Sequence, residues 1–268
     1  MMLTIRASSR LLAVAISLVI SARLAVPLRG QTTTTPTLEE SLGKEVEHFV
    51  EADRLAPPAA CQVLFVGSSS IVKWKETLAA DMEPMPVINR GFGGSHIEYV
   101  NRWFDQLVAP YHPRAIVFYA GENDIDAGKS VDRVVADFDE FMRLKTQSLG
   151  DTPVYFISLK PSKLRFAELP LQTQVNDVIR NRFARRSDLY YLDIVPAMLD
   201  QNGKPKDLFV ADGLHMNADG YRIWTHAVRA ALLPYVEKYG TACRRKLAPG
   251  PTAPPASSPS NRRSSLGR

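Results

Sequence analysis

The most informative segment of the sequence is Val63-Leu64-Phe65-Val66-Gly67-Ser68-Ser69-Ser70-Ile71, residues 63–71 of the chain. Its first four residues are apolar, and a short apolar run that ends at a glycine is typical of a strand buried on both faces. The small residues that follow form a turn which can expose a serine at the start of a helix. Backbone N–H groups and the helix dipole favour a developing oxyanion there. Serine clusters also cap helices, so this stretch alone leaves both interpretations open.

Four further short apolar runs follow along the chain, separated by segments long enough for helices. They are Val87–Ile88, Ala115–Tyr119, Val154–Ile157 and Leu189–Leu192. Strand and helix alternating in this way predict an α/β domain with a five-stranded parallel sheet covered by helices on both faces. Open sheets of this kind bind ligands beyond the carboxyl ends of their strands. The residues that follow each run are therefore the candidates for a functional site.

Two amphipathic helices frame the strands. In the first, apolar residues recur at helical spacing through about Ala52, and Pro57-Pro58 ends the helix. Its apolar residues are Leu38, Leu42, Val46 and Phe49. The last helix is predicted to begin at the N-cap Asn217 and to turn one apolar stripe to the core. The stripe consists of Tyr221, Trp224, Val228, Leu232 and Tyr235.

The ends of the chain differ from its middle in composition. Arg6 and Arg10 precede a mostly apolar segment over residues 11–22, which predicts a secretion signal or, if it is not cleaved, an N-terminal anchor. The last residues hold little besides Pro, Ser, Gly and basic residues, and we expect them to be disordered. The predicted division is a signal or anchor over 1–30, a linker and N-terminal helix over 31–57, one folded domain over 58–243 and a tail over 244–268.

The positive charge of the chain does not indicate a nucleic-acid partner. The sequence has 33 Lys and Arg against 28 Asp and Glu, a net charge of +5. Ten of the basic residues and none of the acidic ones lie in residues 1–36 and 244–268, which leaves residues 37–243 near −5. A basic binding face on the folded domain is therefore not expected. Contact with a membrane is expected only through an uncleaved N-terminal segment.

The chain has two cysteines, Cys61 just ahead of the first predicted strand and Cys243 just after the last helix. An exported chain can oxidise them. A bridge that closes so long a loop contributes at most about 5 kcal/mol through the entropy of the unfolded chain. We predict this disulfide, with two unrelated buried thiols as the alternative.

Glycine-rich and acidic loops follow the second and third predicted strands. The first, residues 89–95, lets the backbone approach a ligand, but His96 breaks the glycine pattern of a dinucleotide site. The second contains Gly121-Glu122-Asn123-Asp124. The nearby Gly128-Lys129-Ser130 is not a phosphate loop, because Asn123 stands where that motif requires glycine. Asp124 and Asp126 lack the later ligands of a calcium loop.

A last polar loop, Asp212-Gly213-Leu214-His215, lies just before the final helix. At this spacing an aspartate can accept a hydrogen bond from His Nδ1 and leave Nε2 free as a base, which is what a serine nucleophile needs. A capping acid beside a surface histidine is the alternative for an isolated pair. Among the other histidines, His96 lies next to the glycine loop and is a candidate neighbour of the site.

Together the four loops resemble the four sequence blocks of the SGNH hydrolases, also called the GDSL family, in the same order and over roughly Cys61 to Tyr235. The first block of the family is usually G-D-S. Gly67-Ser68-Ser69 therefore places a serine where aspartate is customary, and Ser69 matches the nucleophile. The other matches are Gly94 in N-x-G-x-x-G, Asn123 in G-x-N-D, and Asp212 with His215 in D-x-x-H.

The resemblance implies a flavodoxin-like three-layer α/β/α domain with a Ser69, His215 and Asp212 triad. It also implies an oxyanion hole made by the N–H groups of Ser69 and Gly94 and by the Asn123 amide, with no metal or organic cofactor. The expected protein is an exported serine esterase acting on carboxylic esters, with small acyl groups on carbohydrate or a short-chain lipid as substrates.

Three further points stay open at the level of sequence. An acyltransferase acting on envelope polysaccharide would use the same acyl-enzyme with an acceptor other than water. A domain of this family can also bind glycans without catalysis. The segment Lys160–Arg165 follows the fourth strand and is interpreted as a solvated loop, with a cationic substrate wall as the alternative.

Overall fold

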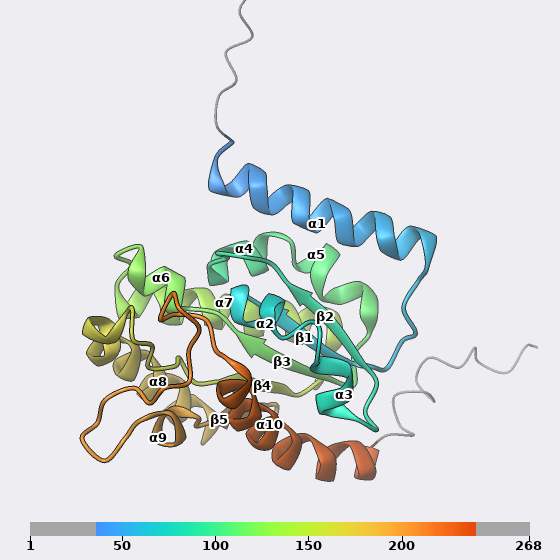
Figure 1. Cartoon of the computed structure of the whole chain (residues 1–268). Coiled ribbons are helices and arrows are strands. Elements are labelled where there is room, and N and C mark those ends of the chain that lie inside the picture. The colour runs from blue at the N-terminus through green and yellow to red at the C-terminus, as the bar shows by residue number, and fades with distance from the viewer. Residues whose placement is uncertain (1–35, 240–268) are drawn as a thin grey trace, which may run out of the picture. The chain divides into compact units, whose positions relative to one another are not determined.

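The structure is a computed structural model that describes residues 36–239. It contains a parallel sheet of five strands in the order β2-β1-β3-β4-β5 (Figure 1). The strands are β1 (Val63–Gly67), β2 (Val87–Gly91), β3 (Ala115–Tyr119), β4 (Val154–Ile157) and β5 (Leu189–Leu192). All five strand predictions are confirmed, and β2 runs three residues further than its apolar part because Asn89, Arg90 and Gly91 continue the pairing with β1.

The register brings the carboxyl ends of β1, β2 and β3 to one level. Gly67, the last residue of β1, pairs with Gly91 on one side and with Tyr119 on the other. β1 and β3 are buried along their whole length, as expected for central strands of a parallel sheet. The loops after β1, β2 and β3 therefore leave the same edge of the sheet side by side.

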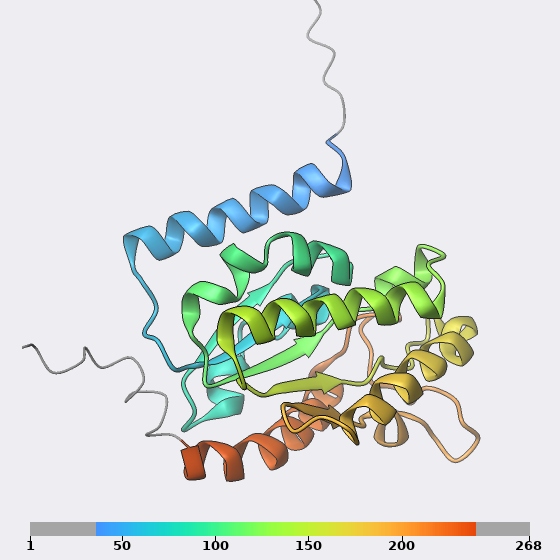
Figure 2. The ribbon, with the colours of Figure 1, turned by 180° about the vertical axis from the view of Figure 1, so that it is seen from behind.

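Helices cover both faces of the sheet and complete the predicted three-layer α/β/α arrangement. On one face lie α2 (Ser69–Lys73), α3 (Leu78–Met82), α9 (Val195–Met198) and α10 (Ala218–Tyr239), in front of the sheet in Figure 1. The other face, seen from behind in Figure 2, carries α4 (Ile97–Arg102), α5 (Phe104–Leu107), α7 (Val131–Leu149) and α8 (Leu169–Phe183). The short α6 (Glu122–Asp126) follows β3, and two 3-10 turns lie at Ala109–Tyr111 and Phe166–Glu168.

An aromatic cluster joins α10 to the sheet. The Trp224 ring lies 5.7 Å from that of Trp74 and 4.6 Å from that of Tyr119, and all three side chains are fully buried. Aromatic pairs in such edge-on geometry contribute roughly 0.5–1.5 kcal/mol beyond the area that they bury. The predicted stripe of the last helix is thus core. Its start is also as predicted, since Asn217 Oδ1 accepts hydrogen bonds from the backbone N–H groups of Asp219 and Gly220.

The predicted N-terminal helix is present as α1 (Leu38–Leu55). Thr37 and Glu40 form a capping box at its start, which satisfies two backbone N–H groups that have no helical partner. Leu42 and Val46 are buried against the domain, whereas Leu38 stays half exposed. The helix runs three residues beyond Ala52 before the two prolines end it.

Several expectations fall on residues outside the described part. The signal or anchor over 1–30, the tail over 244–268 and Cys243 all lie there, so the division of the chain and the Cys61 to Cys243 disulfide stay predictions. Cys61 itself is buried. Between residues 36 and 239 no helix is both long and apolar enough to cross a membrane.

Candidate active site

The turn after β1 is shaped by a close approach of two strands. Gly67 has φ +137°, and a Cβ at this position would lie 1.9 Å from the Tyr119 carbonyl oxygen, so only glycine fits. The next residue, Ser68, donates its backbone N–H to that same oxygen at 2.9 Å. These contacts fix the chain where it leaves β1 and enters α2, whose first residue is Ser69.

Of the three consecutive serines, only Ser69 reaches a base. Ser68 and Ser70 are 4% and 2% exposed and belong to the packed interior, whereas Ser69 is partly exposed. Ser69 Oγ lies 2.9 Å from His215 Nε2, although 146 residues separate them in the chain. The three serines cannot be told apart from the local sequence, but in the structure Ser69 alone contacts a histidine.

The pair Asp212 and His215 has the geometry that its spacing predicts. His215 Nδ1 lies 2.7 Å from Asp212 Oδ2, and Asp212 Oδ1 accepts from the backbone N–H groups of Leu214 and His215 at 2.8 and 2.9 Å. The hydrogen bond with His215 and these backbone bonds lower the pKa of Asp212 to about 2. Asp212 is therefore an anion near neutral pH and favours the Nδ1–H tautomer of His215, which leaves Nε2 free to accept a proton.

The loop after β2 carries the predicted Gly94. Gly94 has φ +76°, a left-handed conformation that glycine adopts without strain. Asn89 holds the start of the loop, since its Nδ2 donates to the Ile71 carbonyl at 2.7 Å and its Oδ1 accepts from Gly91 N at 2.9 Å. The loop is therefore tied to α2, the helix that begins with Ser69.

Helix α1 also contacts this loop, and no pattern in the sequence indicates that contact. Glu45 Oε2 accepts the backbone N–H of Gly93 at 3.1 Å. Leu38 lies against Gly94, with its Cδ1 3.7 Å from where a Cβ at Gly94 would be. Two other acidic residues of α1 pair with basic residues on either side of the loop: Asp53 with Arg90 of β2 at 2.5 Å and Glu39 with Arg102 of α4 at 2.7 Å. Acidic residues recurring along one side of α1 could have indicated these contacts. They cannot be distinguished, however, from the ordinary polar face of an amphipathic helix.

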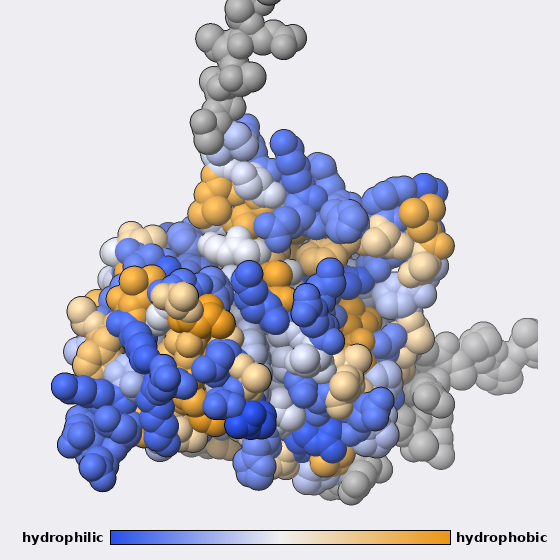
Figure 3. All heavy atoms as spheres, viewed as in Figure 1, coloured by the Kyte–Doolittle hydropathy of each residue, from blue (hydrophilic) through white to orange (hydrophobic). Residues whose placement is uncertain are grey.

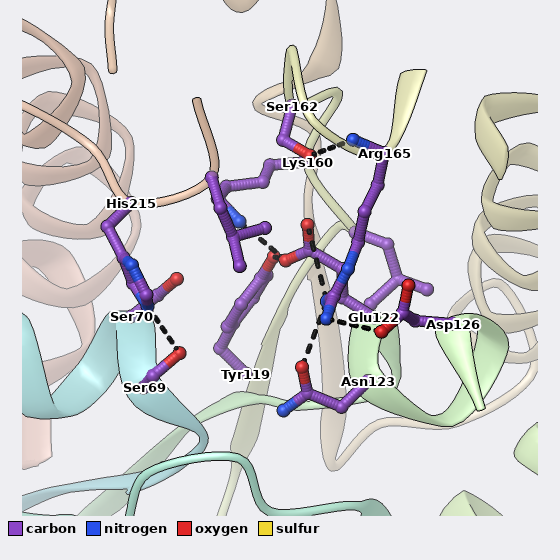
Figure 4. A network of polar contacts seen from close by, with 12 residues as sticks. Ser69, Ser70, Tyr119, Glu122, Asn123, Asp126, Lys160, Ser162, Arg165 and His215 are labelled. Atoms are coloured by element: carbon purple, nitrogen blue, oxygen red, sulfur yellow. Dashed lines mark hydrogen bonds and ion pairs between the residues drawn. The ribbon is translucent and has the colours of Figure 1, made fainter. Parts of the chain in front are cut away.

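Asn123 lies in the first turn of α6, directly after β3. Its Nδ2 donates to the Ser95 carbonyl at 3.1 Å, and its Oδ1 accepts from Arg165 Nη1 at 2.9 Å. Figure 4 shows the amide nitrogen turned to the side on which Ser69 and His215 lie. The second N–H of this amide is available to a ligand bound between them.

The segment Lys160–Arg165 is only partly the solvated loop that we expected. Lys163 and Leu164 are exposed, but Lys160 is 1% exposed and its Nζ lies 2.5 Å from Glu122 Oε2, itself buried. Burial lowers the pKa of Lys160, and the Glu122 carboxylate opposes that shift. Neither interpretation fits Lys160, because a buried residue is not solvated and its charge is already paired.

A buried polar network thus lies beside Asn123 (Figure 4). Glu122 Oε2 also accepts the Tyr119 hydroxyl at 2.7 Å, and Arg165 Nη2 donates to Asp126 at 2.7 Å. The sequence places these residues in two separate loops, after β3 and after β4, and only the parallel order of the strands brings them together.

His96, the predicted neighbour of the site, is the N-cap of α4 and lies 3.6 Å from Glu98 through its Nδ1. It follows Ser95, whose carbonyl binds Asn123, so it is close to the site in sequence, but the imidazole that contacts Ser69 is that of His215. In the described range, residues 36–239, no three His, Cys, Asp or Glu side chains gather as metal ligands would.

Comparison with known proteins agrees with this geometry. Residues 60–223 match the GDSL-like lipase/acylhydrolase family, and the chain belongs to this family. The resemblance drawn from the four loops is therefore confirmed. No protein of curated function matches the sequence.

Solved structures show the same fold at low sequence identity. A protein of Bacteroides fragilis proposed to be an acylhydrolase is 17% identical, with a TM-score of 0.63 over 75% of this chain and 99% of that one. A GDSL-like lipase of Bacteroides thetaiotaomicron is 18% identical, with a TM-score of 0.61 over 70% and 97%. A carbohydrate esterase family 3 protein of Talaromyces cellulolyticus is 16% identical, with a TM-score of 0.54 over 66% and 99%.

Proposed function

We propose that this protein is an exported serine esterase that hydrolyses carboxylic esters with small acyl groups, carried on carbohydrate or on a small lipid. One observation supports this activity above all. Ser69 Oγ, the His215 ring and the Asp212 carboxylate form a continuous chain of contacts of 2.9 and 2.7 Å. Such a chain activates a serine hydroxyl, which is otherwise a poor nucleophile at neutral pH.

The reaction begins when His215 Nε2 takes the hydroxyl proton of Ser69 as Oγ attacks the ester carbonyl. Asp212 stabilises the imidazolium that forms. The negative charge on the former carbonyl oxygen is held by the N–H groups of Ser69 and Gly94 and by Asn123 Nδ2. His215 then gives its proton to the departing alcohol, which leaves an acyl-enzyme on Ser69.

Water completes the cycle by the same steps in reverse. His215 takes a proton from the water molecule as it attacks the acyl carbonyl, and the oxyanion hole again holds the charge. Collapse of this intermediate breaks the bond to Ser69 Oγ, which recovers its proton from His215. The products are a carboxylic acid and an alcohol, and the enzyme returns to its starting state.

The surroundings of the catalytic groups support a small acyl group. Two exposed leucines flank the catalytic loops: Leu38 lies against Gly94, and the Leu164 backbone N–H binds the Gly213 carbonyl at 3.0 Å. Next to Asn123, by contrast, the wall is made of charged groups. A long alkyl chain needs a continuous apolar channel to recover the free energy of leaving water. On the face seen in Figure 3, apolar patches are small and separated by hydrophilic residues.

A series of p-nitrophenyl esters from acetate to palmitate tests this proposal directly. We expect turnover of the acetate and butyrate esters, and kcat/KM lower by about tenfold or more for chains beyond eight carbons, since added methylenes find no apolar wall. Release of acetate from acetylated xylo-oligosaccharides would place the substrate among carbohydrates. A preference for palmitate would contradict the substrate class, and no turnover of any ester by folded protein would favour a glycan-binding domain.

Export rests on the predicted signal over residues 1–30, and its test is separate from that of the activity. The intact mass of protein recovered outside the cytoplasm should lack the leader, with a cleavage point between Ala22 and Gln31. The mass before and after reductant with thiol alkylation should also reveal the predicted bridge between Cys61 and Cys243. Full-length protein retained in the membrane would instead indicate an anchor.

A further inference from the structure

We propose that Arg165 is a positioning residue of the oxyanion hole, which holds the Asn123 amide so that its nitrogen faces the reacting carbonyl. The inference rests on the proposed esterase function and names a residue that lies outside all four sequence blocks. Arg165 touches neither Ser69 nor His215, so it would act through Asn123 alone.

The contacts of Arg165 hold its guanidinium group at both ends. Nη1 donates to Asn123 Oδ1 at 2.9 Å and Nη2 to Asp126 Oδ2 at 2.7 Å, while the backbone N–H of Arg165 binds Ser162 Oγ at 3.2 Å. The side chain is 11% exposed. A planar group with two fixed hydrogen bonds has little freedom to rotate, so the atom that faces Asn123 is well defined.

The chemistry of the two partners decides the orientation of the amide. A guanidinium group only donates hydrogen bonds, so the amide atom that faces Arg165 has to be the oxygen. On the other side Asn123 Nδ2 faces the Ser95 carbonyl, which only accepts. A flipped amide would set an NH₂ group against Arg165 and an oxygen against the Ser95 carbonyl, which is unfavourable at both contacts. The arrangement therefore selects the orientation that presents an N–H to the site.

The orientation matters because the two ends of the amide have opposite effects on an oxyanion. The N–H group stabilises the developing negative charge, whereas the flipped oxygen would repel it. A hydrogen bond from a cation to Oδ1 also polarises the amide and strengthens its N–H as a donor. Loss of Arg165 would therefore lower the rate of the chemical step more than the binding of substrate.

The nearby carboxylates explain why a cation is tolerated here. Glu122 Oε1 lies 4.0 Å from Arg165 Nη1, and Asp126 takes the other end of the guanidinium. Lys160 neutralises Glu122 from the opposite side at 2.5 Å. The positive charge of Arg165 is thus balanced by nearby carboxylates, and none of them displaces Asn123 Oδ1 as the acceptor of the hydrogen bond from Nη1.

The test is Arg165→Met, which keeps an apolar stem and removes every side-chain donor, beside Arg165→Lys, which keeps the charge and one donor nitrogen. We expect Arg165→Met to lower kcat for p-nitrophenyl acetate by about 10- to 100-fold with KM changed less than about threefold, and Arg165→Lys to recover part of the loss. Arg180→Met is the matched control, because Arg180 also pairs with two carboxylates, Asp177 and Asp193, and should leave kcat unchanged.

Two further measurements separate positioning from a structural role. Guanidinium ion at tens of millimolar should raise kcat of Arg165→Ala but not of the wild type. In an Asn123→Ala background, Arg165→Met should lower kcat by less than about twofold, since the amide that Arg165 positions is gone.

Three results would overturn the inference. The first is wild-type kcat in Arg165→Met. The second is an undiminished effect of Arg165→Met in the Asn123→Ala background, which would mean that Arg165 acts on the substrate or on the fold. The third is a wild-type protein inactive on every ester, which would overturn the proposed function and this inference together, whereas the first two leave the esterase proposal intact.

Discussion

The two halves of the candidate site are built in different ways. On the triad side, Asp212 and His215 are three residues apart and bind through one short loop, so only the contact with Ser69 spans the chain. On the oxyanion side, Asn123 is held by Arg165 at a separation of 42 residues, and Gly93 by Glu45 at 48. The half proposed to transfer protons is fixed mainly by local contacts, whereas the half proposed to stabilise charge depends on the assembled fold.

The electrostatics of the two halves differ as well. Asp212 is 45% exposed, and its pKa of about 2 makes it an anion near neutral pH. On the oxyanion side, burial, followed by the hydrogen bond and the charge of Asp126, raises the pKa of Glu168 to about 7. The oxyanion side therefore contains a group that titrates near neutral pH.

The largest expected effect comes from breaking the triad at its nucleophile. Ser69→Ala should lower kcat by roughly 10⁴- to 10⁶-fold, because no other group can form the acyl-enzyme. Thermal unfolding should show that the variant is folded. Ser68→Ala and Ser70→Ala are the matched controls and should keep kcat within about tenfold. Activity retained in Ser69→Ala and lost in either control would move the nucleophile to another serine.

Asn123→Ala tests the other half and should have the second largest effect. Removing one oxyanion donor typically costs about 10²- to 10³-fold in kcat. Since Asn123 is only partly buried, the melting temperature should fall by no more than about 3 °C. Steady-state kinetics with p-nitrophenyl acetate would measure the effect. A kcat within threefold of the wild type would show that the oxyanion is held without this amide.

Glu45→Ala tests whether the helix outside the sequence blocks supports the oxyanion side. The hydrogen bond from the Gly93 N–H to Glu45 is worth on the order of 1 kcal/mol, so kcat/KM should fall about 3- to 10-fold. Glu47→Ala, an exposed residue on the same helix, is the control and should have no effect. Equal behaviour of the two variants would show that α1 does not position the glycine loop.

The smallest effect is a pH dependence of stability. The folded protein keeps a proton on Glu168 that the unfolded chain releases above pH 4.5, so wild-type stability should fall as pH rises from 4.5 to about 7 and then level off. Glu168→Gln does not titrate, and its melting temperature should gain about 1–2 °C on the wild type across this window. Differential scanning fluorimetry from pH 4 to 8 would measure it.

A second glutamate gives that measurement its control. The hydrogen bond to Arg143 lowers the pKa of Glu140, so the folded state is favoured above pH 4.5 and the sign is reversed. The melting temperature of Glu140→Gln should therefore fall, not rise, relative to that of the wild type as pH rises through the acid range. A pH-independent difference for Glu168→Gln would contradict the raised pKa of Glu168.

The sequence was sufficient for the fold and for the local parts of the site. Apolar runs of four or five residues identify four of the strands because a buried parallel strand has no polar face, and the shorter run Val87–Ile88 identifies the edge strand β2. Asp212 and His215 are paired by their spacing of three residues. Each of these conclusions depends on neighbours in the chain.

The remaining parts depend on tertiary contacts that leave no local pattern. Lys160 and Arg165 look like an exposed basic loop, but the order of β3 and β4 places them against Glu122 and Asn123. Glu45 looks like any residue on the polar face of a helix. Only the resemblance to the family singles out Ser69 as the nucleophile among the three serines. The physical difference between them is burial, which cannot be predicted from a run of identical residues.

Helix α1 has a practical consequence for work on this protein. It lies ahead of the residues that match the family, 60–223, and yet it contacts the glycine loop through Glu45 and Leu38. A recombinant fragment cut at the edge of the family match would keep every group of the triad while exposing Gly93 and Gly94 to solvent. Expression boundaries are therefore better drawn at Pro36 than at residue 60, so that an inactive fragment is not mistaken for an inactive enzyme.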